Sequence, residues 1–205
     1  AFGNFQRMLA DFPADTLTET IAGFHDTKAR FAAFEKAVEE DVCGRAAGVQ
    51  QEIRFIKDRY DVACVLGDLL EAGELPLRVT HNDTKSNNVL MDNTTGKGLC
   101  VIDLDTVMPG LAVNDFGDSI RFGASTGAED EKDLSKISCD MELYDIYAKG
   151  FVEGCGGALT DMEIECLPIG AKVMTYECGM RFLTDYLSGD TYFKVDYPTH
   201  NLDRT

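Results

Sequence analysis

The feature that most constrains the fold is a run of apolar residues at helical spacing near the end of the chain. Six of them recur every three or four positions before Gly189: Ile169, Val173, Tyr176, Met180, Leu183 and Leu187. This period places their side chains on one face of a helix, which must be buried against other elements. The residues therefore predict a helical body with an apolar core.

Two further helical segments are predicted in the first third of the chain. Asp26 is an N-cap candidate for the first, which closes at Gly44 and carries an apolar stripe at Phe31, Phe34 and Val38. The second has apolar or small residues at helical spacing from Val49 to Leu70 and ends at Gly73. We expect both stripes to belong to the core.

After Gly110 the pattern becomes helical again. One helix is marked by Tyr144, Tyr147 and Phe151 and ends at the glycines 154, 156 and 157. Thr160 and Glu163 predict a capping box for a short helix. Pro168 predicts the first turn of the next helix, where a proline is tolerated.

Between these helical parts lies a short β region. Leu77–Thr80 is extended and β-branched, and Val89–Met91 and Leu99–Ile102 flank the turn signal Asn93-Thr94-Thr95-Gly96. The predicted fold class is therefore mainly α with a small β-hairpin (α+β). We expect one domain over residues 1–205, because no repeat or low-complexity linker divides the chain.

Composition excludes several partners and predicts a cytoplasmic protein. The formal net charge is −17, from 36 acidic and 19 basic residues, so binding to nucleic acid or to an anionic membrane surface is not expected. No apolar run is long enough to span a membrane. The seven cysteines are scattered without a CxxC pair, which predicts mostly buried free thiols.

The residues that could support catalysis lie in two segments, the predicted catalytic loop at 79–90 and a predicted metal-binding segment at 101–110. The first contains His81, Asp83 and, five residues later, Asn88; the second contains Asp103. Phosphoryl transfer needs an oriented hydroxyl and cations that mask phosphate charge. Asp83 supplies a base or orienting group, and Asn88 and Asp103 supply the hard oxygen ligands that Mg²⁺ prefers. Turn-forming Asp and Asn residues are the alternative, but the ordered set favours catalysis.

The same residues resemble the aminoglycoside phosphotransferase and choline kinase superfamily, which has the protein-kinase-like fold. More narrowly, the chain resembles bacterial N-acetylhexosamine 1-kinases. The resemblance rests on five stretches: V-T-H-N-D-T-K-x-N-N-V-L from Val79, V-I-D-L-D-T-V-M-P-G from Val101, D-F-G-D-x-I-R from Asp115, R-F-L-T-D-Y-L-x-G-D from Arg181 and H-N-L-D-R from His200.

The resemblance implies roles for individual residues. Asp83 is the expected catalytic residue, Asn88 and Asp103 are the expected magnesium ligands, and His81 is expected to brace the loop. Asp105 would reach a second metal through water, or is simply an exposed carboxylate. Either Asp115 or Asp118 would hold the catalytic loop through its backbone amides, and the choice stays open.

Substrate contacts are expected further along the chain. Arg181 is expected to bind the acceptor, with an i,i+4 pair to Glu177 as the alternative. Tyr192 is a second acceptor contact, unless its ring only packs. Lys85 and Asn87 are expected to be solvated or capping residues, and His25 to have no special role.

The expected activity is ATP- and Mg²⁺-dependent phosphorylation of the anomeric hydroxyl of an N-acetylhexosamine. Other acceptors such as an aminoglycoside, choline or homoserine, a pseudokinase-like binding module and a metal-dependent hydrolase are the alternatives. The resembled kinases have an amino-terminal ATP-grasping lobe, but nothing before His81 has its Gly-rich hairpin or strand lysine. We therefore expect the carboxy-terminal lobe only, weak ATP binding, almost no turnover for this chain alone, and self-association through the exposed inter-lobe surface.

Overall fold

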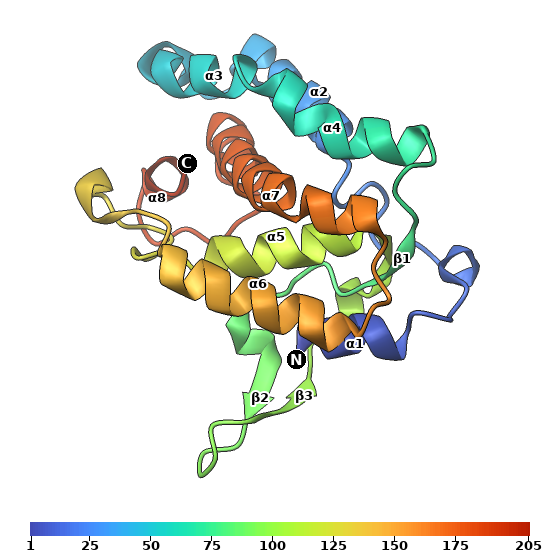
Figure 1. The fold of residues 1–205 in the computed structure, drawn as a ribbon. Helices are drawn as coiled ribbons and strands as arrows, with labels where there is room; N and C mark the ends of the chain where they lie inside the picture. The colour runs from blue at the N-terminus through green and yellow to red at the C-terminus, as the bar shows by residue number, and fades with distance from the viewer.

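The 27-residue helix α7 (Asp161–Leu187) is the element against which most of the other helices pack (Figure 1). The computed structural model describes all residues from 1 to 205. The other helices are α1 (Phe2–Met8), α2 (Thr27–Glu40), α3 (Gln50–Lys57), α4 (Tyr60–Glu71), α5 (Ala112–Gly123), α6 (Met141–Cys155) and α8 (His200–Asp203). Five single-turn 3₁₀ helices span Ala14–Thr16, Ala46–Gly48, Ser86–Asn88, Leu104–Thr106 and Leu134–Lys136.

Four short strands make two antiparallel pairs. Strand β1 (Arg78–Thr80) pairs with β4 (Met108–Gly110), and β2 (Val89–Met91) pairs with β3 (Gly98–Val101) in a hairpin that projects from the helical body (Figure 1). The carboxylate of Asp92 closes the hairpin turn by accepting hydrogen bonds from two backbone amides. The predicted fold class is confirmed: the protein is mainly helical with a small hairpin. The partner of β1 was not predicted, because Met108-Pro109-Gly110 has no alternating strand pattern.

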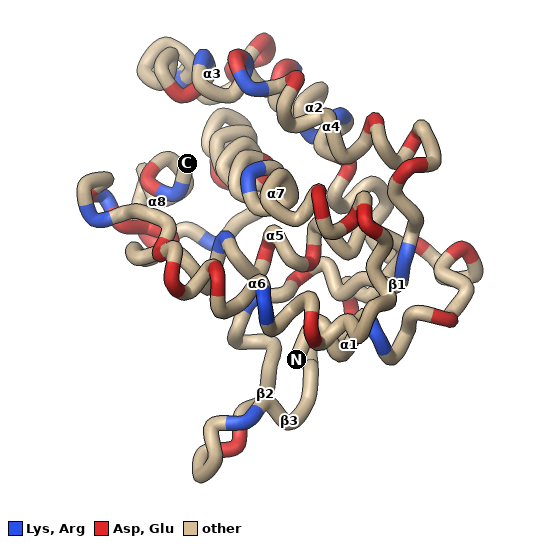
Figure 2. Tube along the Cα trace, in the orientation of Figure 1, with Lys and Arg blue, Asp and Glu red and all other residues tan.

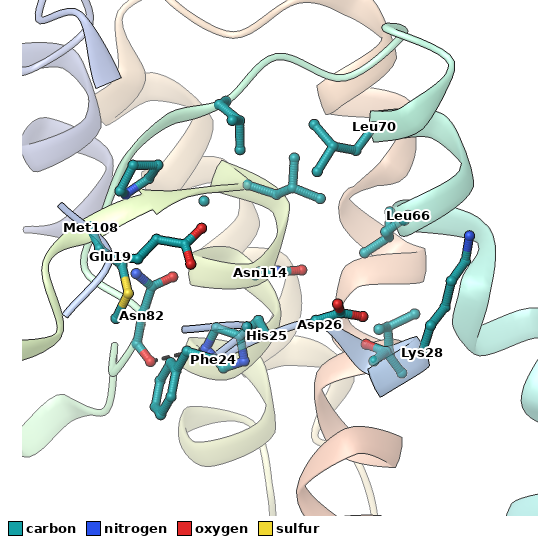
Figure 3. A pocket seen from close by; sticks show the side chains of 18 of the residues that line it. Glu19, Phe24, His25, Asp26, Lys28, Leu66, Leu70, Asn82, Met108 and Asn114 are labelled. Carbon is teal, nitrogen blue, oxygen red and sulfur yellow. Dashed lines mark hydrogen bonds between the residues drawn. The ribbon is translucent and has the colours of Figure 1, made fainter. Parts of the chain in front are cut away.

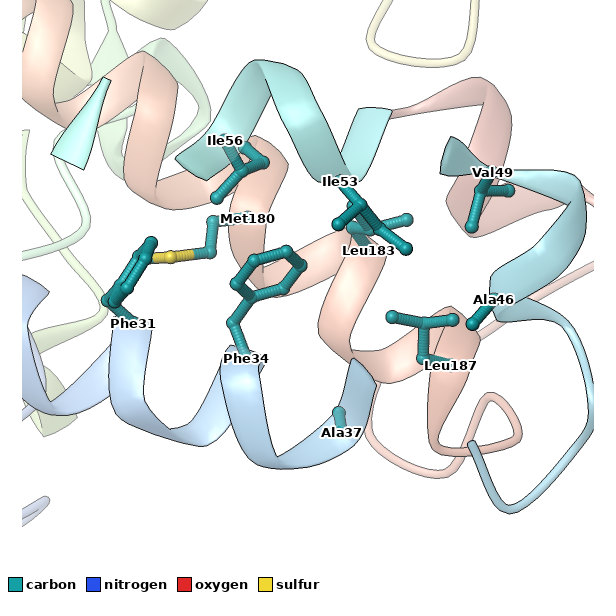
Figure 4. Close-up of a cluster of buried hydrophobic side chains, with 10 residues drawn as sticks. All are labelled: Phe31, Phe34, Ala37, Ala46, Val49, Ile53, Ile56, Met180, Leu183 and Leu187. Atoms are coloured by element: carbon teal, nitrogen blue, oxygen red, sulfur yellow. The ribbon is translucent and has the colours of Figure 1, made fainter. Parts of the chain in front are cut away.

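Three buried clusters join the helices. The largest lies where α2 and α3 meet the second half of α7 (Figure 4), and its members are Phe31, Phe34, Ala37, Ala46, Val49, Ile53, Ile56, Met180, Leu183 and Leu187. A second cluster joins α1, α5 and α6, and a third joins α4 and α5 to the first half of α7. The helical stripes expected at Phe31 and Phe34 and along α7 therefore form the core.

The contact between α5 and α7 is built on glycine. A Cβ atom on Gly117 of α5 would lie 2.5 Å from the carbonyl carbon of Gly170 and 2.8 Å from Cγ of Met174. A Cβ on Gly170 would lie 2.5 Å from the carbonyl oxygen of Val113. Only residues without a side chain allow the two backbones to approach this closely. This crossing fixes α5, which carries Asp115 and Asp118, against the central helix.

Two predicted helix boundaries are wrong. The segment predicted as one helix from Val49 to Leu70 is two helices, because the chain bends at Asp58 and Arg59. The bend directs α3 to the cluster under α2 and α4 to the cluster beside α5, two cores that one straight helix does not reach. Pro168 lies inside α7 instead of starting a helix. It removes one backbone hydrogen bond, and the packing on either side of it keeps the helix continuous.

Several local predictions agree with the structure. Asp26 caps α2 by accepting from the Ala29 amide, and Thr160 and Glu163 form the capping box of α7. All seven cysteines are free, but Cys43, Cys100 and Cys139 are exposed, so the expectation of mostly buried thiols is wrong. Acidic residues are spread along the trace with Lys and Arg between them (Figure 2). No helix combines the length and apolarity needed to cross a bilayer.

Candidate active site

The predicted catalytic loop runs from β1 to β2 and is held by a carboxylate beneath it. Asp115 of α5 is fully buried and accepts hydrogen bonds from the backbone amides of His81 (2.9 Å) and Asn82 (2.8 Å). The amide of Gln6 on α1 donates to the same carboxylate at 2.8 Å. Burial raises the pKa of Asp115, and these three donors act in the opposite direction. Asn82 has a φ of +64°, a left-handed conformation that such anchoring stabilises.

Asp118, one helical turn later, holds the next part of the loop. Its carboxylate accepts from the Thr84 amide at 2.9 Å and pairs with Arg121 at 3.0 Å. The hydroxyl of Ser119 donates to the Thr84 carbonyl at 2.9 Å. The sequence left the choice between Asp115 and Asp118 open, and in the structure both carboxylates bind loop amides. Each takes a different segment, one before Asp83 and one after it.

His81 is buried behind the loop. Its Nε2 atom contacts the carbonyl oxygen of Ile102 at 2.9 Å, and its Nδ1 atom accepts from the Asp83 amide at 3.3 Å. With Nδ1 accepting, Nε2 is the ring nitrogen that donates to the Ile102 carbonyl. The rings of Phe2 and Phe5 lie edge-on to it. His81 thereby joins the loop to the segment that carries Asp103, a bracing position rather than one from which it transfers a proton.

Asp83 lies at the partly open end of the loop. Its Oδ2 atom accepts from Lys85 Nζ at 2.7 Å and from Asn88 Nδ2 at 2.9 Å, and its side chain is 29% exposed. Burial opposes the charge on Lys85, but its hydrogen bond to Asp83 and the charges of Asp103 and Asp118 outweigh burial and raise the Lys85 pKa. Lys85 was expected to be solvated, and its ion pair to Asp83 corrects that expectation.

The expected magnesium ligands, Asn88 and Asp103, each have a side-chain oxygen that is not used in holding the loop. Asn88 donates through Nδ2 to both the carbonyl and the carboxylate of Asp83, so its Oδ1 atom remains free to act as a ligand. Asp103 follows Ile102, whose amide donates to the Asn88 carbonyl at 2.9 Å. The Asp103 carboxylate is exposed and accepts no hydrogen bond. One amide and one carboxylate oxygen suit an ion that keeps several waters and binds phosphate oxygens.

Asp105 is not drawn into this group. Its side chain is exposed and makes no hydrogen bond or ion pair, and its backbone carbonyl accepts a hydrogen bond from Thr20 Oγ1. No set of three or more His, Cys, Asp or Glu side chains in the chain could hold a metal. The structure therefore brings Asn88 and Asp103 to the loop and leaves Asp105 at the surface.

Arg181 and Tyr192 line one small pocket of about 220 Å³ between α2 and the end of α7. The Arg181 guanidinium lies over the rings of Phe24, Tyr192 and Phe193 at 5.3–5.7 Å. The alternative pairing of Arg181 with Glu177 is not made, because Glu177 binds His25 and Thr27 instead. Arg30 lines the same pocket and donates to the carbonyl of Phe24. Neither arginine has a carboxylate within ion-pair distance, which leaves the pocket with two unpaired positive charges.

Asp185 shapes this pocket and was not predicted. Its buried carboxylate accepts from the backbone amides of Thr191, Tyr192 and Phe193 at 2.8–3.0 Å and from Asn201 Nδ2 at 2.9 Å. These bonds turn the chain after α7 back toward Arg181. The R-F-L-T-D stretch contains Asp185, but an acidic residue near a helix end gives no sign in sequence that it will bind a distant loop.

His25 is the second missed residue. It lies beside a cavity of about 380 Å³ behind the catalytic loop (Figure 3) and contacts both Glu177 of α7 and the Asn82 carbonyl. Its position before an N-cap gave no indication of these contacts, which join residues 152 and 57 positions apart.

Comparison with known families adds one finding. Residues 1–147 match the family described as APH, Phosphotransferase enzyme family. The matched range contains the catalytic loop, Asp103 and the two carboxylates of α5. It ends before Arg181, Asp185 and Tyr192, so only Arg30 and Ala33 of the pocket that they line fall within the matched range.

Proposed function

Because this chain belongs to the phosphotransferase enzyme family, we propose that it transfers the γ-phosphoryl group of ATP to the anomeric hydroxyl of an N-acetylhexosamine. The product would be a sugar 1-phosphate. Small-molecule phosphotransfer is the activity that family membership supports. In this chain the main support for the proposal is the carboxylate of Asp83, which is partly exposed and is held by hydrogen bonds from Lys85 and Asn88.

Asp83 would orient the acceptor hydroxyl and take its proton. The hydroxyl oxygen forms a bond to the γ-phosphorus as the bond from that phosphorus to the bridging oxygen of ADP breaks. Because hydrogen bonds already hold this base in the loop, little free energy is needed to reorganise it when the reaction occurs. Lys85, which stays protonated, places a positive charge beside the reacting groups.

Asn88 and Asp103 would hold the magnesium ion. When bound, the ion masks the negative charge of the phosphate oxygens. In this acidic chain the need for such masking is large, because the formal net charge is −17. Asp103 has a left-handed backbone with a φ of +65°, and such strained conformations cluster at functional sites, which supports this role.

The acceptor would occupy the pocket of Arg181 and Tyr192. Arg30 and Arg181 both line it without a carboxylate partner, and the carboxylate of Asp185 is saturated by its own donors. Such a pocket disfavours a cationic acceptor such as an aminoglycoside or choline, and favours a neutral polyol. The cavity of about 220 Å³ suits a single sugar ring.

We also propose that residues 1–205 form the carboxy-terminal lobe and that tight ATP binding requires a second, ATP-grasping lobe. All four strands lie between Arg78 and Gly110, and none of them forms a phosphate-covering hairpin before the catalytic loop. The β2–β3 hairpin exposes Leu90, Met91 and Leu99, which such a lobe would cover.

The test is phosphotransfer with product identification by mass. Residues 1–205, any longer product of the same reading frame, and matched Asp83→Asn variants are incubated with Mg-ATP and a panel of N-acetylhexosamines, choline and aminoglycosides. A sugar 1-phosphate that disappears with Asp83→Asn supports the proposal. Phosphate on another acceptor keeps the reaction and rejects the sugar. No phosphate on any acceptor favours the non-catalytic binding module.

A further inference from the structure

His25 connects the central helix to the catalytic loop. Its Nδ1 atom lies 2.7 Å from Oε1 of Glu177 on α7, and its Nε2 atom lies 3.1 Å from the carbonyl oxygen of Asn82. Figure 3 shows this second contact beside the cavity behind the loop. The side chains are enclosed, with His25 10% and Glu177 1% exposed.

Both contacts require a proton on the imidazole. A backbone carbonyl only accepts hydrogen bonds, and an ionised carboxylate also only accepts. Glu177 receives a second hydrogen bond, from Thr27 Oγ1 to Oε2 at 2.7 Å, which favours its ionised form. A neutral imidazole has one N–H and satisfies one of these partners. His25 therefore makes both bonds only as an imidazolium.

The surrounding charges favour the same state. Burial opposes the charge on His25, but the hydrogen bond and charge of Glu177, the Asn82 carbonyl and Asp118 of α5 together raise its pKa. Burial likewise opposes the charge on Glu177, but its bonds from His25 and Thr27 and the charge of Arg181 lower its pKa. Arg30 of α2 also acts on Glu177, and Glu19, Asp26 and Lys28 line the cavity beside His25.

The other two histidines provide a contrast within the same chain. In each, Nδ1 accepts a hydrogen bond from a backbone amide: that of Asp83 for His81 and that of Asp196, at 3.1 Å, for His200. A ring nitrogen that accepts a hydrogen bond does not donate one, so in these two rings only Nε2 is placed to donate. His200 also lies near carboxylates, with Asp130 Oδ2 3.4 Å from its Nε2 atom and Asp196 Oδ2 4.0 Å from its Nδ1 atom. His25 is the one histidine that has an acceptor within hydrogen-bond distance of each nitrogen and a donor opposite neither.

We propose that His25 is a positioning residue of the phosphotransfer site, an imidazolium that ties the Asn82 carbonyl to Glu177 and thereby fixes the backbone on which Asp83 stands. The proposal rests on the phosphotransferase function stated above. When His25 loses its proton, one of its two bonds breaks. Asn82, in its left-handed conformation, then loses an anchor directly before Asp83. Phosphotransfer should therefore fall on the alkaline side as His25 titrates.

The protonation state is tested without any turnover. Nitrogen-15 NMR of uniformly labelled protein distinguishes imidazolium from the two neutral forms, and the chain has three histidines to assign. At pH 7 we expect one ring with both nitrogens protonated, and its signals should be absent from the spectrum of His25→Gln. A neutral His25 ring at pH 7 would overturn the proposal whether or not the protein proves to be a kinase.

The positioning role is tested by pH profiles of kcat. His25→Ala should lower kcat by about tenfold, the effect of losing one charge-assisted hydrogen bond. His25→Gln keeps a donor for the Asn82 carbonyl but does not titrate, so it should recover part of the rate and lose the alkaline limb. Glu177→Gln should move that limb to lower pH, since the imidazolium loses its counter-charge.

His200→Gln is the matched control, because this buried histidine lies on α8 and contacts no part of the loop. It should leave the shape of the profile unchanged, with folding of each variant checked by circular dichroism. An alkaline limb that survives in His25→Gln, or disappears in His200→Gln, contradicts the positioning role. If neither residues 1–205 nor any longer product of the same reading frame transfers phosphate, the function fails, while the NMR result still decides the state of His25.

Discussion

Replacing Gly117 with alanine tests whether the glycine crossing of α5 and α7 supports the active site. The new Cβ would lie 2.5 Å from the Gly170 carbonyl carbon, whereas ordinary contact begins at 3.4 Å, so the helices must separate by about 0.9 Å. Alanine favours a helix over glycine by about 1 kcal/mol. Overpacking of a closed interior costs about 1–3 kcal/mol. The steric effect should win, with a net loss of roughly 2 kcal/mol at the upper end of that range.

Gly150→Ala is the matched control, because it lies on the exposed face of α6 and a Cβ there meets nothing within 4 Å. It should stabilise the protein by about 0.5–1 kcal/mol through helix propensity alone. In thermal unfolding a chain of this size shifts by about 2–4 °C per kcal/mol. We therefore expect Tm to fall by roughly 4–8 °C for Gly117→Ala and to rise by a few degrees for Gly150→Ala. Equal stabilisation by the two substitutions would refute the reasoning, since it would mean that α5 and α7 can separate without a loss of stability.

Four further substitutions test single contacts. Asp185→Ala leaves three backbone amides without their acceptor, so we expect about 2–3 kcal/mol lower stability in urea and a roughly tenfold higher KM for the acceptor, with the KM for Mg-ATP unchanged. Thr160→Ala removes the capping box of α7 and should cost about 1 kcal/mol in the same unfolding assay; no loss would show that the cap is dispensable. Because folding lowers the pKa of Glu177, its ionised carboxylate stabilises the folded protein at pH values above the ordinary pKa of 4.5. This stability is lost as pH falls through the pKa of the folded state. Glu177→Gln should therefore flatten the acid side of a plot of stability against pH. Folding raises the pKa of His25, so its contribution to stability is lost as pH rises above 6.5 and through the pKa of the folded state. His25→Gln should therefore flatten the alkaline side of the same plot.

Local patterns were sufficient to predict the fold class and several of its details. The cap at Asp26, the capping box at Thr160 and the hairpin turn after Asp92 depend on residues within a few positions of one another. Such features are visible in sequence because the interacting groups are neighbours. The break between α3 and α4 was missed because it is caused by two separate cores, and a helical period does not show where each face will be buried.

In the candidate site, too, the contacts between near neighbours were predictable and the long-range contacts were not. The spacing of Asp83 and Asn88 within one loop pointed to a shared site, and the structure joins their side chains by a hydrogen bond. The supporting contacts from His25 and Asp185 were missed because they cross long stretches of chain, as does the bond from Gln6 to Asp115 across 109 positions. A single sequence has no local signal for such pairs.

The wide sequence separation of these contacts also has a consequence for folding kinetics. Helices form from near neighbours and are expected early, whereas contacts between distant residues form only after long loops have closed. The catalytic loop is anchored by α1, by His25 and by α5, so its geometry depends on parts of the chain that meet late. During refolding from urea, far-ultraviolet circular dichroism should recover before the hydrogen-exchange protection of the His81 and Asn82 amides. The loop is thus a reporter of the last stage of folding.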